Sequence, residues 1–219
     1  MSTAHAPPLE RYRSARRYTD RATKAAYIAE KYATALAGSV LDVGCDEAPL
    51  RRLVASPTRY VGVDVRADAD VTIDLDRDNL PFPDRSFDTV VCTDVLEHLE
   101  RCHAVFDELC RVAATRVIAS LPNPLRVLLE SLAHGGEGRI KYYGLPAERP
   151  PDRHRWFFGH DEAAEFLSRR GERSGFAVEQ LDTEDAPLPV WRARDGADVL
   201  SSGNARGGTI WCVLHRNGG

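Results

Sequence analysis

Short apolar runs alternate with helical patterns through the first half of the chain. The apolar runs, each long enough for one strand, cover residues 39–45, 59–65, 71–76, 87–92 and 116–120. Such runs are typical of strands that are buried on both faces of a parallel sheet. Residues 95–114 instead carry apolar side chains three and four positions apart, which predicts a helix. This alternation predicts a doubly wound α/β fold.

The link between the second and third predicted strands is short. Only residues 66–70 separate them, whereas a parallel crossover takes about a dozen residues. We therefore expect the third strand to be a short edge piece without a helix of its own, or else not to be parallel.

The region before the first strand has a helical pattern. Alanines, Tyr32 and Leu36 recur three or four positions apart over residues 9–37, and Gly38 favours a helix end there. The sequence thus predicts an N-terminal helical extension over residues 1–38, followed by one domain over residues 39–219.

The second half of the chain adds helices and strands to this domain. Helical patterns cover residues 125–133 and 161–170, and strand patterns cover residues 176–181 and 209–215. Together with the earlier runs they predict a seven-stranded, mostly parallel, Rossmann-like sheet. Two polar stretches near 134–158 and 185–208 fit no regular element, and we expect them to be insertions.

Composition and charge narrow the function classes. Lys and Arg number 29 against 33 Asp and Glu, a formal charge of −4, which disfavours nucleic acid as the main partner. The five cysteines form no CxxC pair, so we expect reduced thiols, a cytoplasmic location and no metal site. The sequence shows no secretory signal and no apolar stretch that would span a bilayer, so no membrane partner is expected. Homo-oligomerisation is left open.

The first two predicted strands end in residues that suit a nucleoside ligand. The first strand runs into Gly44, which lets the backbone approach a ligand closely, and the second ends in Asp64, about 20 residues on. An acid at that place accepts hydrogen bonds from both ribose hydroxyls in dinucleotide sites. A tight turn with a capping aspartate explains the same two residues without a ligand.

Two later segments carry a family resemblance. Residues 80–88 read LPFPDRSFD, and residues 96–99 read LEHL after the fourth strand. With VLDVGC and VGVDV upstream, they closely resemble class I S-adenosylmethionine-dependent methyltransferases of the small-molecule type. The resemblance covers about residues 40–123 and implies S-adenosyl-L-methionine as the cofactor.

The resemblance also implies a set of cofactor-binding residues. Asp42 would approach the methionine part, Gly44 would let the chain pass against it, and Asp64 would hold the ribose hydroxyls. An acid after the third strand would contact the adenine amino group, and both Asp74 and Asp76 fit the spacing. The full implied set is Asp42, Gly44, Cys45, Asp46, Asp64, Val65, Asp74, Leu75, Asp76 and Thr93.

The Gly-rich loop departs from the family pattern. The family motif is GCGxG, but residues 44–49 read GCDEAP, with Asp46 and Ala48 in place of the second and third glycines. A cofactor-binding fold relative with other chemistry, or with no catalysis, therefore stays open as an alternative. A nicotinamide-dependent dehydrogenase would need GxGxxG after the first strand, which this loop does not supply. A nucleic-acid methyltransferase is disfavoured by the acidic balance.

The stretch from residue 141 to residue 158 carries the candidate acceptor site. Its DRHRWFF text resembles a subset of these methyltransferases associated with glycan and natural-product pathways, so a sugar, nucleotide-sugar or secondary-metabolite intermediate is expected as the acceptor. We expect His154 to act as the base for an acceptor hydroxyl, although a structural histidine in a packed core fits as well. The Glu97-His98 pair is usually structural in the family. The aromatic and basic residues predicted to bind the substrate are Tyr142, Tyr143, Arg153, Arg155 and Trp156.

Overall fold

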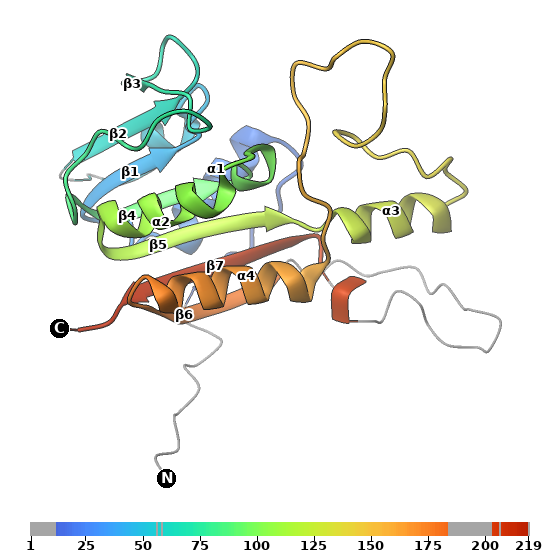
Figure 1. Ribbon diagram of the computed structural model, residues 1–219. Coiled ribbons are helices and arrows are strands. Elements are labelled where there is room, and N and C mark those ends of the chain that lie inside the picture. Colours follow the sequence, from blue (N-terminus) through green and yellow to red (C-terminus); the bar gives the residue numbers. More distant parts are fainter. Residues whose placement is uncertain (1–11, 56, 58, 184–202, 206, 219) are drawn as a thin grey trace.

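A single seven-stranded sheet forms the centre of the molecule (Figure 1). The structure, a computed structural model, describes residues 12–55, 57, 59–183, 203–205 and 207–218. The strand order is β3-β2-β1-β4-β5-β7-β6, and β7 runs in the direction opposite to the other six strands. The strands are β1 (Ser39–Val43), β2 (Arg59–Asp64), β3 (Val71–Thr72), β4 (Phe87–Thr93), β5 (Ala113–Pro122), β6 (Phe176–Thr183) and β7 (Thr209–Arg216).

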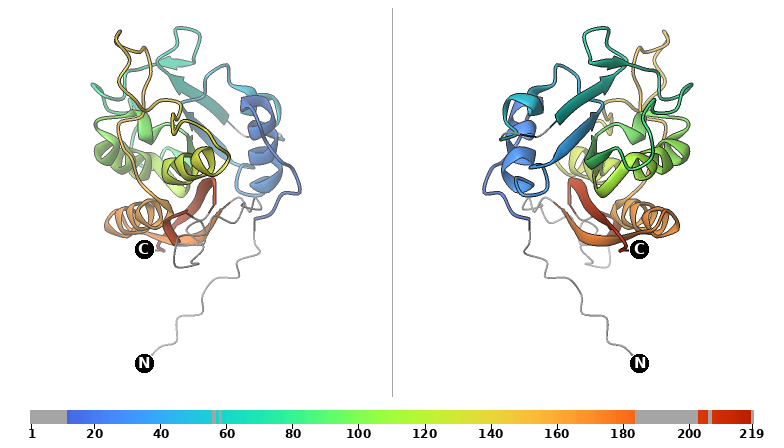
Figure 2. Two further views of the ribbon diagram at one scale, coloured as in Figure 1. Left: turned by 90° about the vertical axis from the view of Figure 1, so that its right-hand side faces the viewer. Right: turned by 90° about the vertical axis from the view of Figure 1, so that its left-hand side faces the viewer.

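Helices cover both faces of this sheet. The α-helices are α1 (Arg21–Lys31), α2 (Cys102–Val112), α3 (Pro124–Ala133) and α4 (His160–Arg173). The described residues also form the short 3-10 helices η1 (Pro49–Arg52), η2 (Leu96–His98) and η4 (Gly203–Ala205). Helix α1 lies on one side of the sheet and α2 and α4 lie on the other (Figure 2). The predicted doubly wound, mostly parallel α/β fold with an N-terminal helix is confirmed.

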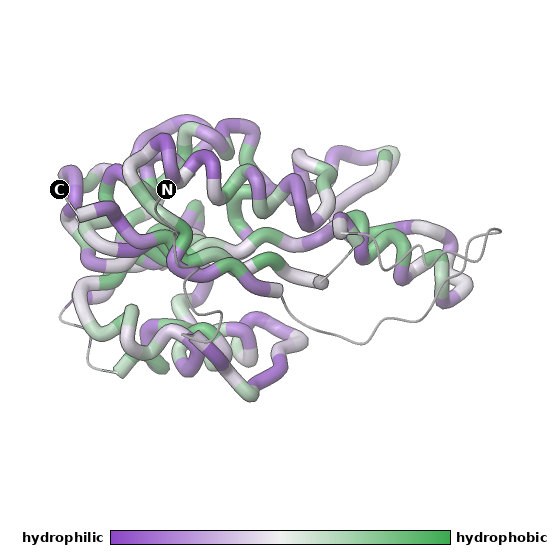
Figure 3. The backbone as a smooth tube through the Cα atoms, turned by 90° about the horizontal axis from the view of Figure 1, so that it is seen from below, coloured by the Kyte–Doolittle hydropathy of each residue, from purple (hydrophilic) through white to green (hydrophobic). Residues whose placement is uncertain are grey.

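The two faces of the sheet bury separate clusters. Successive side chains of a strand point to opposite faces, so Leu41 packs with α2 and α4 whereas Val40 packs with α1. Trp211 of β7 lies among Tyr18, Tyr27 and Tyr32 in the cluster under α1. The hydrophobic stretches of the backbone concentrate in the central strands, while the helices alternate hydrophobic and hydrophilic residues (Figure 3).

Helix α1 is shorter than the pattern over residues 9–37 predicts. It begins only at Arg21, because Asp20 accepts a hydrogen bond from the Thr23 backbone and the Thr23 side chain in turn caps the Asp20 N–H. The described residues before Asp20 form no helix.

The helix expected over residues 95–114 was also wrong in its bounds. The chain forms η2 first and begins α2 at Cys102, while residues 113 and 114 already belong to β5. The expected third strand is a two-residue edge strand that pairs in parallel with β2, so the first of the two options for it holds.

The stretch near 134–158 crosses the carboxyl ends of the strands. It contains no helix or strand and runs beside the ends of β4 and β5 (yellow to orange in Figure 1). Most of the second predicted insertion, near 185–208, lies outside the described residues. Within the described part of the chain, no helix combines the length and the apolar character needed to cross a membrane.

Candidate functional site

A cavity of about 690 Å³ opens at the carboxyl ends of β1, β2 and β4. Strand ends meet at one edge of a parallel sheet, and ligands of doubly wound folds bind at that edge. Helix α1 and the segment 134–158 complete the cavity walls. Of the ten residues predicted to bind the cofactor, all except Asp76 line it.

The loop after β1 keeps a glycine-like backbone although two of the three glycines of the family motif are replaced. Gly44 has a φ of +77°, and a Cβ there would lie 2.1 Å from a methyl group of Val95. Asp46 and Ala48 have φ values of 51° and 50°, the left-handed region that side chains disfavour. The loop that departs from GCGxG in sequence therefore keeps left-handed backbone at all three glycine positions of the family pattern.

Hydrogen bonds and ion pairs hold this loop in place. The Asp46 N–H donates to Oδ2 of Asp64 at 2.9 Å. The Asp46 carboxylate pairs with Arg21 at 2.5 Å and with Arg66 at 3.5 Å. Arg21 was not among the predicted site residues, because its partner Asp46 lies 25 positions away along the chain.

The Asp42 side chain is buried at the cavity wall. It accepts a hydrogen bond from the Tyr60 hydroxyl, which opposes protonation. Burial is the larger effect and, with the nearby charge of Asp64, raises the pKa of Asp42 to about 6. A cationic ligand group beside Asp42 would favour its ionised form.

The structure separates the two acids that compete after the third strand. Asp74 lines the cavity. Asp76 lies outside the lining, and its Oδ1 accepts a hydrogen bond from the Arg101 backbone N–H at 3.1 Å, at the start of α2. Only Asp74 is therefore placed to contact a ligand in the cavity.

Lys24 of α1 is a cavity residue that the sequence analysis missed. Its amine forms an ion pair with Asp94 and lies 3.5 Å from the Ser120 hydroxyl. It also sits 4.9 Å from the centroid of the Trp211 ring. Helix α1 is thus joined to the ends of β4 and β5 across the cavity.

Three rings pack together at the cavity wall. The Tyr142 and His154 rings are stacked 4.7 Å apart, and His98 meets His154 edge-on at 4.4 Å. Because Tyr142 and His154 come from the segment 134–158 while His98 ends η2, this cluster joins that segment to the sheet.

The hydrogen bonds around His154 assign its neutral tautomer. The Tyr143 hydroxyl donates to the Trp156 carbonyl at 2.7 Å, so His154 Nδ1, 3.2 Å away, donates to the Tyr143 oxygen. Nε2 then carries the lone pair. Burial, reinforced by His98, lowers the pKa of His154 to about 4, which keeps the ring neutral at pH 7.

Glu97 is buried beside this cluster. Its side chain is 1% exposed, and its Oε2 has no hydrogen-bond partner among the described residues. Burial, with the nearby Asp94 charge, raises the pKa of Glu97 well above its usual range. Sequence reasoning treated the Glu97-His98 pair as structural, and no local pattern signals an unpartnered carboxylate.

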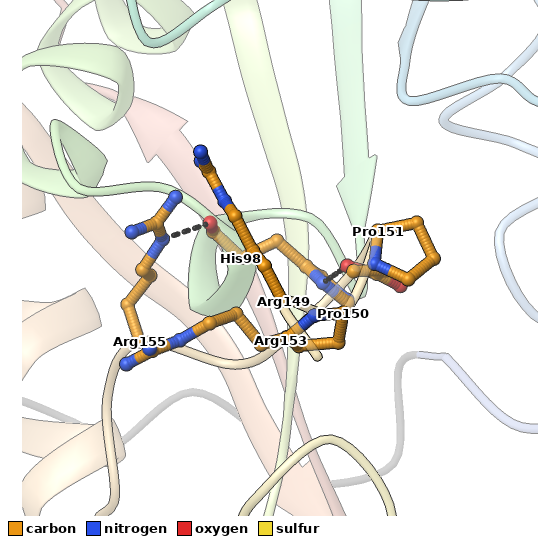
Figure 4. Close-up of a pocket in the computed structure, with 7 residues that line it drawn as sticks. His98, Arg149, Pro150, Pro151, Arg153 and Arg155 are labelled. Carbon is orange, nitrogen blue, oxygen red and sulfur yellow. Dashed lines mark hydrogen bonds and ion pairs between the residues drawn. The ribbon is translucent and has the colours of Figure 1, made fainter. Parts of the chain in front are cut away.

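A second pocket, of about 650 Å³, adjoins the first through His98, Pro151 and Asp152 (Figure 4). Its other lining residues include Arg149, Arg153 and Arg155. The Arg155 side chain is held by the His98 carbonyl at 3.2 Å. The predicted substrate residues Arg153 and Arg155 thus lie together in a cationic pocket beside the larger cavity.

The predicted substrate residues do not all face a pocket. Tyr142 lines the main cavity. The Tyr143 hydroxyl oxygen accepts the hydrogen bond of His154 Nδ1, and the Trp156 indole donates to the Leu99 carbonyl at 2.7 Å. Tyr143 and Trp156 line neither of the two pockets described here.

A family model described as "Methyltransferase domain" matches residues 10–181. The chain belongs to this methyltransferase family. The cofactor of the family is S-adenosylmethionine. This methyltransferase presents groups that fit it, namely the buried Asp42 carboxylate, which suits a cationic amine, and Asp64 at the end of β2, which suits ribose hydroxyls.

Solved structures support the fold assignment. An S-adenosylmethionine-dependent methyltransferase from Archaeoglobus fulgidus is 16% identical with a TM-score of 0.56, covering 90% of this chain and 95% of that one. Magnesium protoporphyrin IX methyltransferase from Synechocystis, solved with bound SAH, is 17% identical with a TM-score of 0.53, covering 89% and 81%. The [4+2]-cyclase SpnF is 15% identical with a TM-score of 0.53, covering 90% and 82%. No curated protein matches the sequence.

Proposed function

We propose that the protein transfers the methyl group of S-adenosylmethionine to a hydroxyl of a small anionic acceptor, such as a sugar, a nucleotide-sugar or a secondary-metabolite intermediate. The observation that carries the proposal is the junction of the two pockets. An acid-lined cavity at the strand ends adjoins an arginine-lined pocket, and His98 and His154 lie near the boundary.

The acids of the larger cavity would bind the cofactor. Asp42 would face the cationic methionine end, and Asp64 would accept the ribose hydroxyls with the lone pairs that its backbone partners leave free. Asp74 would contact the adenine amino group. The cofactor supplies an electrophilic methyl group when bound.

The arginine pocket would bind the acceptor. Neither Arg149 nor Arg153 forms an ion pair within the described part of the chain, so both guanidinium groups are available to an anionic ligand. Guanidinium groups form bidentate hydrogen bonds with phosphate and carboxylate groups. The Tyr142 ring, stacked on His154 and with the Lys141 amine 4.5 Å from its centroid, adds an aromatic wall and a further cation beside the main cavity.

His154 is the proposed catalytic residue. Its Nε2 carries the lone pair in the tautomer that Tyr143 fixes. As the acceptor oxygen forms its bond to the methyl group, the hydroxyl proton would pass to this nitrogen. Positioning of the two reactants supplies the rest of the acceleration.

A second candidate is a fold relative with other chemistry. SpnF shares the fold and is a cyclase, and the loop of this chain replaces two glycines of the family pattern. The two candidates differ in whether a methyl group moves, so a product assay separates them.

The five cysteines bear on the location of the protein. All are buried free thiols. Reduced thiols are typical of the cytoplasm, and this supports the cytoplasmic location that we propose.

Isothermal titration with S-adenosylmethionine and S-adenosylhomocysteine tests the cofactor site. Because Asp74 lines the cavity and Asp76 does not, Asp74→Asn should weaken binding by about tenfold and Asp76→Asn, its matched control, should leave it unchanged. Equal effects of the two variants would contradict the assignment of Asp74.

A labelled-methyl screen tests the reaction. Phosphorylated sugars, sugar nucleotides and hydroxylated metabolites would be offered beside their uncharged analogues. We expect transfer to an anionic member of a pair and weaker transfer to its uncharged analogue, and Arg153→Ser should raise the KM for that acceptor. Cofactor binding without any transfer would favour the second candidate.

A further inference from the structure

Three potential metal ligands meet where the two pockets join. One carboxylate oxygen of Glu97 and one ring nitrogen each of His98 and His154 all lie within 4.8 Å of one another. All three residues line the main cavity. The sequence predicted no metal site because paired ligand spacing is missing, but here the third residue lies 56 positions beyond the second.

The Glu97 carboxylate needs a partner that the described chain does not supply. Its Oε2 is buried without a hydrogen bond, and Oε1 lies 4.0 Å from His98 Nε2. The nearby Lys24 amine is paired with Asp94 instead. A buried oxygen without a hydrogen-bond partner is costly, and a bound cation would supply the missing partner.

The hydrogen bonds of both histidines fix the tautomer that a metal ligand needs. His98 donates from Nδ1 to the Asp152 carboxylate at 2.6 Å, and His154 donates from Nδ1 to the Tyr143 hydroxyl oxygen at 3.2 Å. These bonds leave Nε2 of each ring with its lone pair. Metal-bound histidines almost always donate their other ring N–H to such an outer partner, which fixes the tautomer.

We propose that Glu97, His98 and His154 bind a divalent first-row transition-metal ion. Two imidazoles and one carboxylate on one side of the ion are typical of such metals and leave coordination positions open to the cavity. Ligand atoms around a tetrahedral Zn²⁺ lie about 3.4 Å apart. The three ligand atoms here lie within 4.8 Å of one another, so small side-chain rotations would bring them to that spacing.

The ion would change how an acceptor hydroxyl is activated. Coordination lowers the pKa of a bound hydroxyl, whose proton then passes to solvent water while the oxygen keeps its electron pair. With the ion bound, Nε2 of His154 would be a metal ligand, and solvent water would take the proton that His154 accepts in the metal-free enzyme. This step rests on the proposed function, whereas the metal site itself does not.

Co²⁺ is a suitable probe for the site. Titration of the full-length protein with Co²⁺, followed by visible absorption, should show one bound ion with nitrogen and oxygen ligands and no thiolate charge-transfer band, and Zn²⁺ should displace it. Glu97→Gln and His154→Gln should each weaken Co²⁺ binding about tenfold or more. The matched control is His134→Gln, since His134 is an exposed histidine at the end of α3.

Two outcomes would overturn the site. One is an absorption spectrum that Co²⁺ does not change, and the other is Co²⁺ binding that Glu97→Gln and His154→Gln leave at the level of the parent protein. Circular dichroism and the melting temperature, measured in the same variants, are the check that they fold. Metal binding without any methyl transfer would contradict the proposed function and leave the metal site standing.

Discussion

The pKa of the Asp42 carboxyl is set by burial and by the charged and polar groups around it. The Tyr60 hydroxyl and the Arg51 guanidinium favour its ionised form, while burial and the Asp64 charge oppose it. The Cys45 thiol also faces this group, and burial raises its own pKa to about 12, so it stays protonated. The balance places the pKa of Asp42 at about 6.

This pKa predicts a pH dependence of cofactor affinity. Below about pH 6 Asp42 is protonated and offers no charge to the cationic methionine end, so affinity for S-adenosylmethionine should fall by up to about tenfold per pH unit. Above that pH the carboxylate is ionised and affinity should level off. Titration calorimetry across this range measures the effect. Asp42→Asn should flatten the profile, and an unchanged profile in that variant would exclude Asp42 as its origin.

Asp64 has a structural task besides its proposed contact with ribose. Its two oxygens accept from the backbone N–H groups of Asp46 and Arg66. Asp64→Ala should therefore weaken S-adenosylhomocysteine binding by about 1–3 kcal/mol, through both the lost ribose partner and the loosened loop. Calorimetry at neutral pH measures it, and unchanged affinity would remove Asp64 from the site.

At the scale of elements, the loop between β1 and η1 carries backbone strain. Ala48 holds a φ of 50° just before the proline of η1. Ala48→Gly should raise the free energy of unfolding by up to about 1 kcal/mol, because glycine adopts this backbone without strain.

Thermal unfolding tests the strain at Ala48, and a second alanine-to-glycine variant, expected to change the melting temperature in the opposite direction, is the control. Ala104 is exposed in the first turn of α2, where alanine is a better helix former than glycine. Ala104→Gly should lower the melting temperature, whereas Ala48→Gly should raise it by about 2–4 °C. A lower melting temperature in both variants would show that Ala48 is not strained.

The elements that sequence predicted best are those with strong local signals. The inner strands β1 and β4 are continuous apolar runs, and the structure places them within a residue or two of the prediction. The helix expected from residue 95 failed because its apolar spacing continues through η2, whereas Asp76 accepts from the Arg101 N–H and marks the start of α2. That contact comes from a distant part of the chain and leaves no local pattern.

The residues of the candidate site also fall into two groups, those with a local sequence signal and those without one. The acids of the cofactor cavity stand at strand ends, so the strand pattern and the family resemblance located them together. Lys24 and the unpartnered oxygen of Glu97 depend on contacts between separate elements. The sequence offers no signal for such contacts until the fold brings the elements together.

At the scale of the whole molecule, helix α1 is part of the cavity wall. Arg21 reaches Asp46 and Lys24 reaches Asp94, so α1 joins the ends of β1 and β4. A ligand in the cavity should therefore protect α1 and the segment 134–158 from hydrogen exchange.

Deuterium uptake with and without S-adenosylhomocysteine measures this protection. Peptides from α1 should exchange more slowly with the ligand, while α4, which packs on the other face of the sheet, should exchange at an unchanged rate. Equal protection of α1 and α4 would indicate general stabilisation instead of contact with the cavity.

Trp211 gives the molecule a built-in optical probe. Its indole is buried against three tyrosines, and the Lys24 amine that reaches the cavity lies 4.9 Å from its centroid. An ammonium group that moves over an indole shifts the energy of its excited state. In a variant that keeps Trp211 and replaces Trp156 and Trp191, emission therefore records rearrangement of Lys24, so ligand arrival can be followed in real time without a dye.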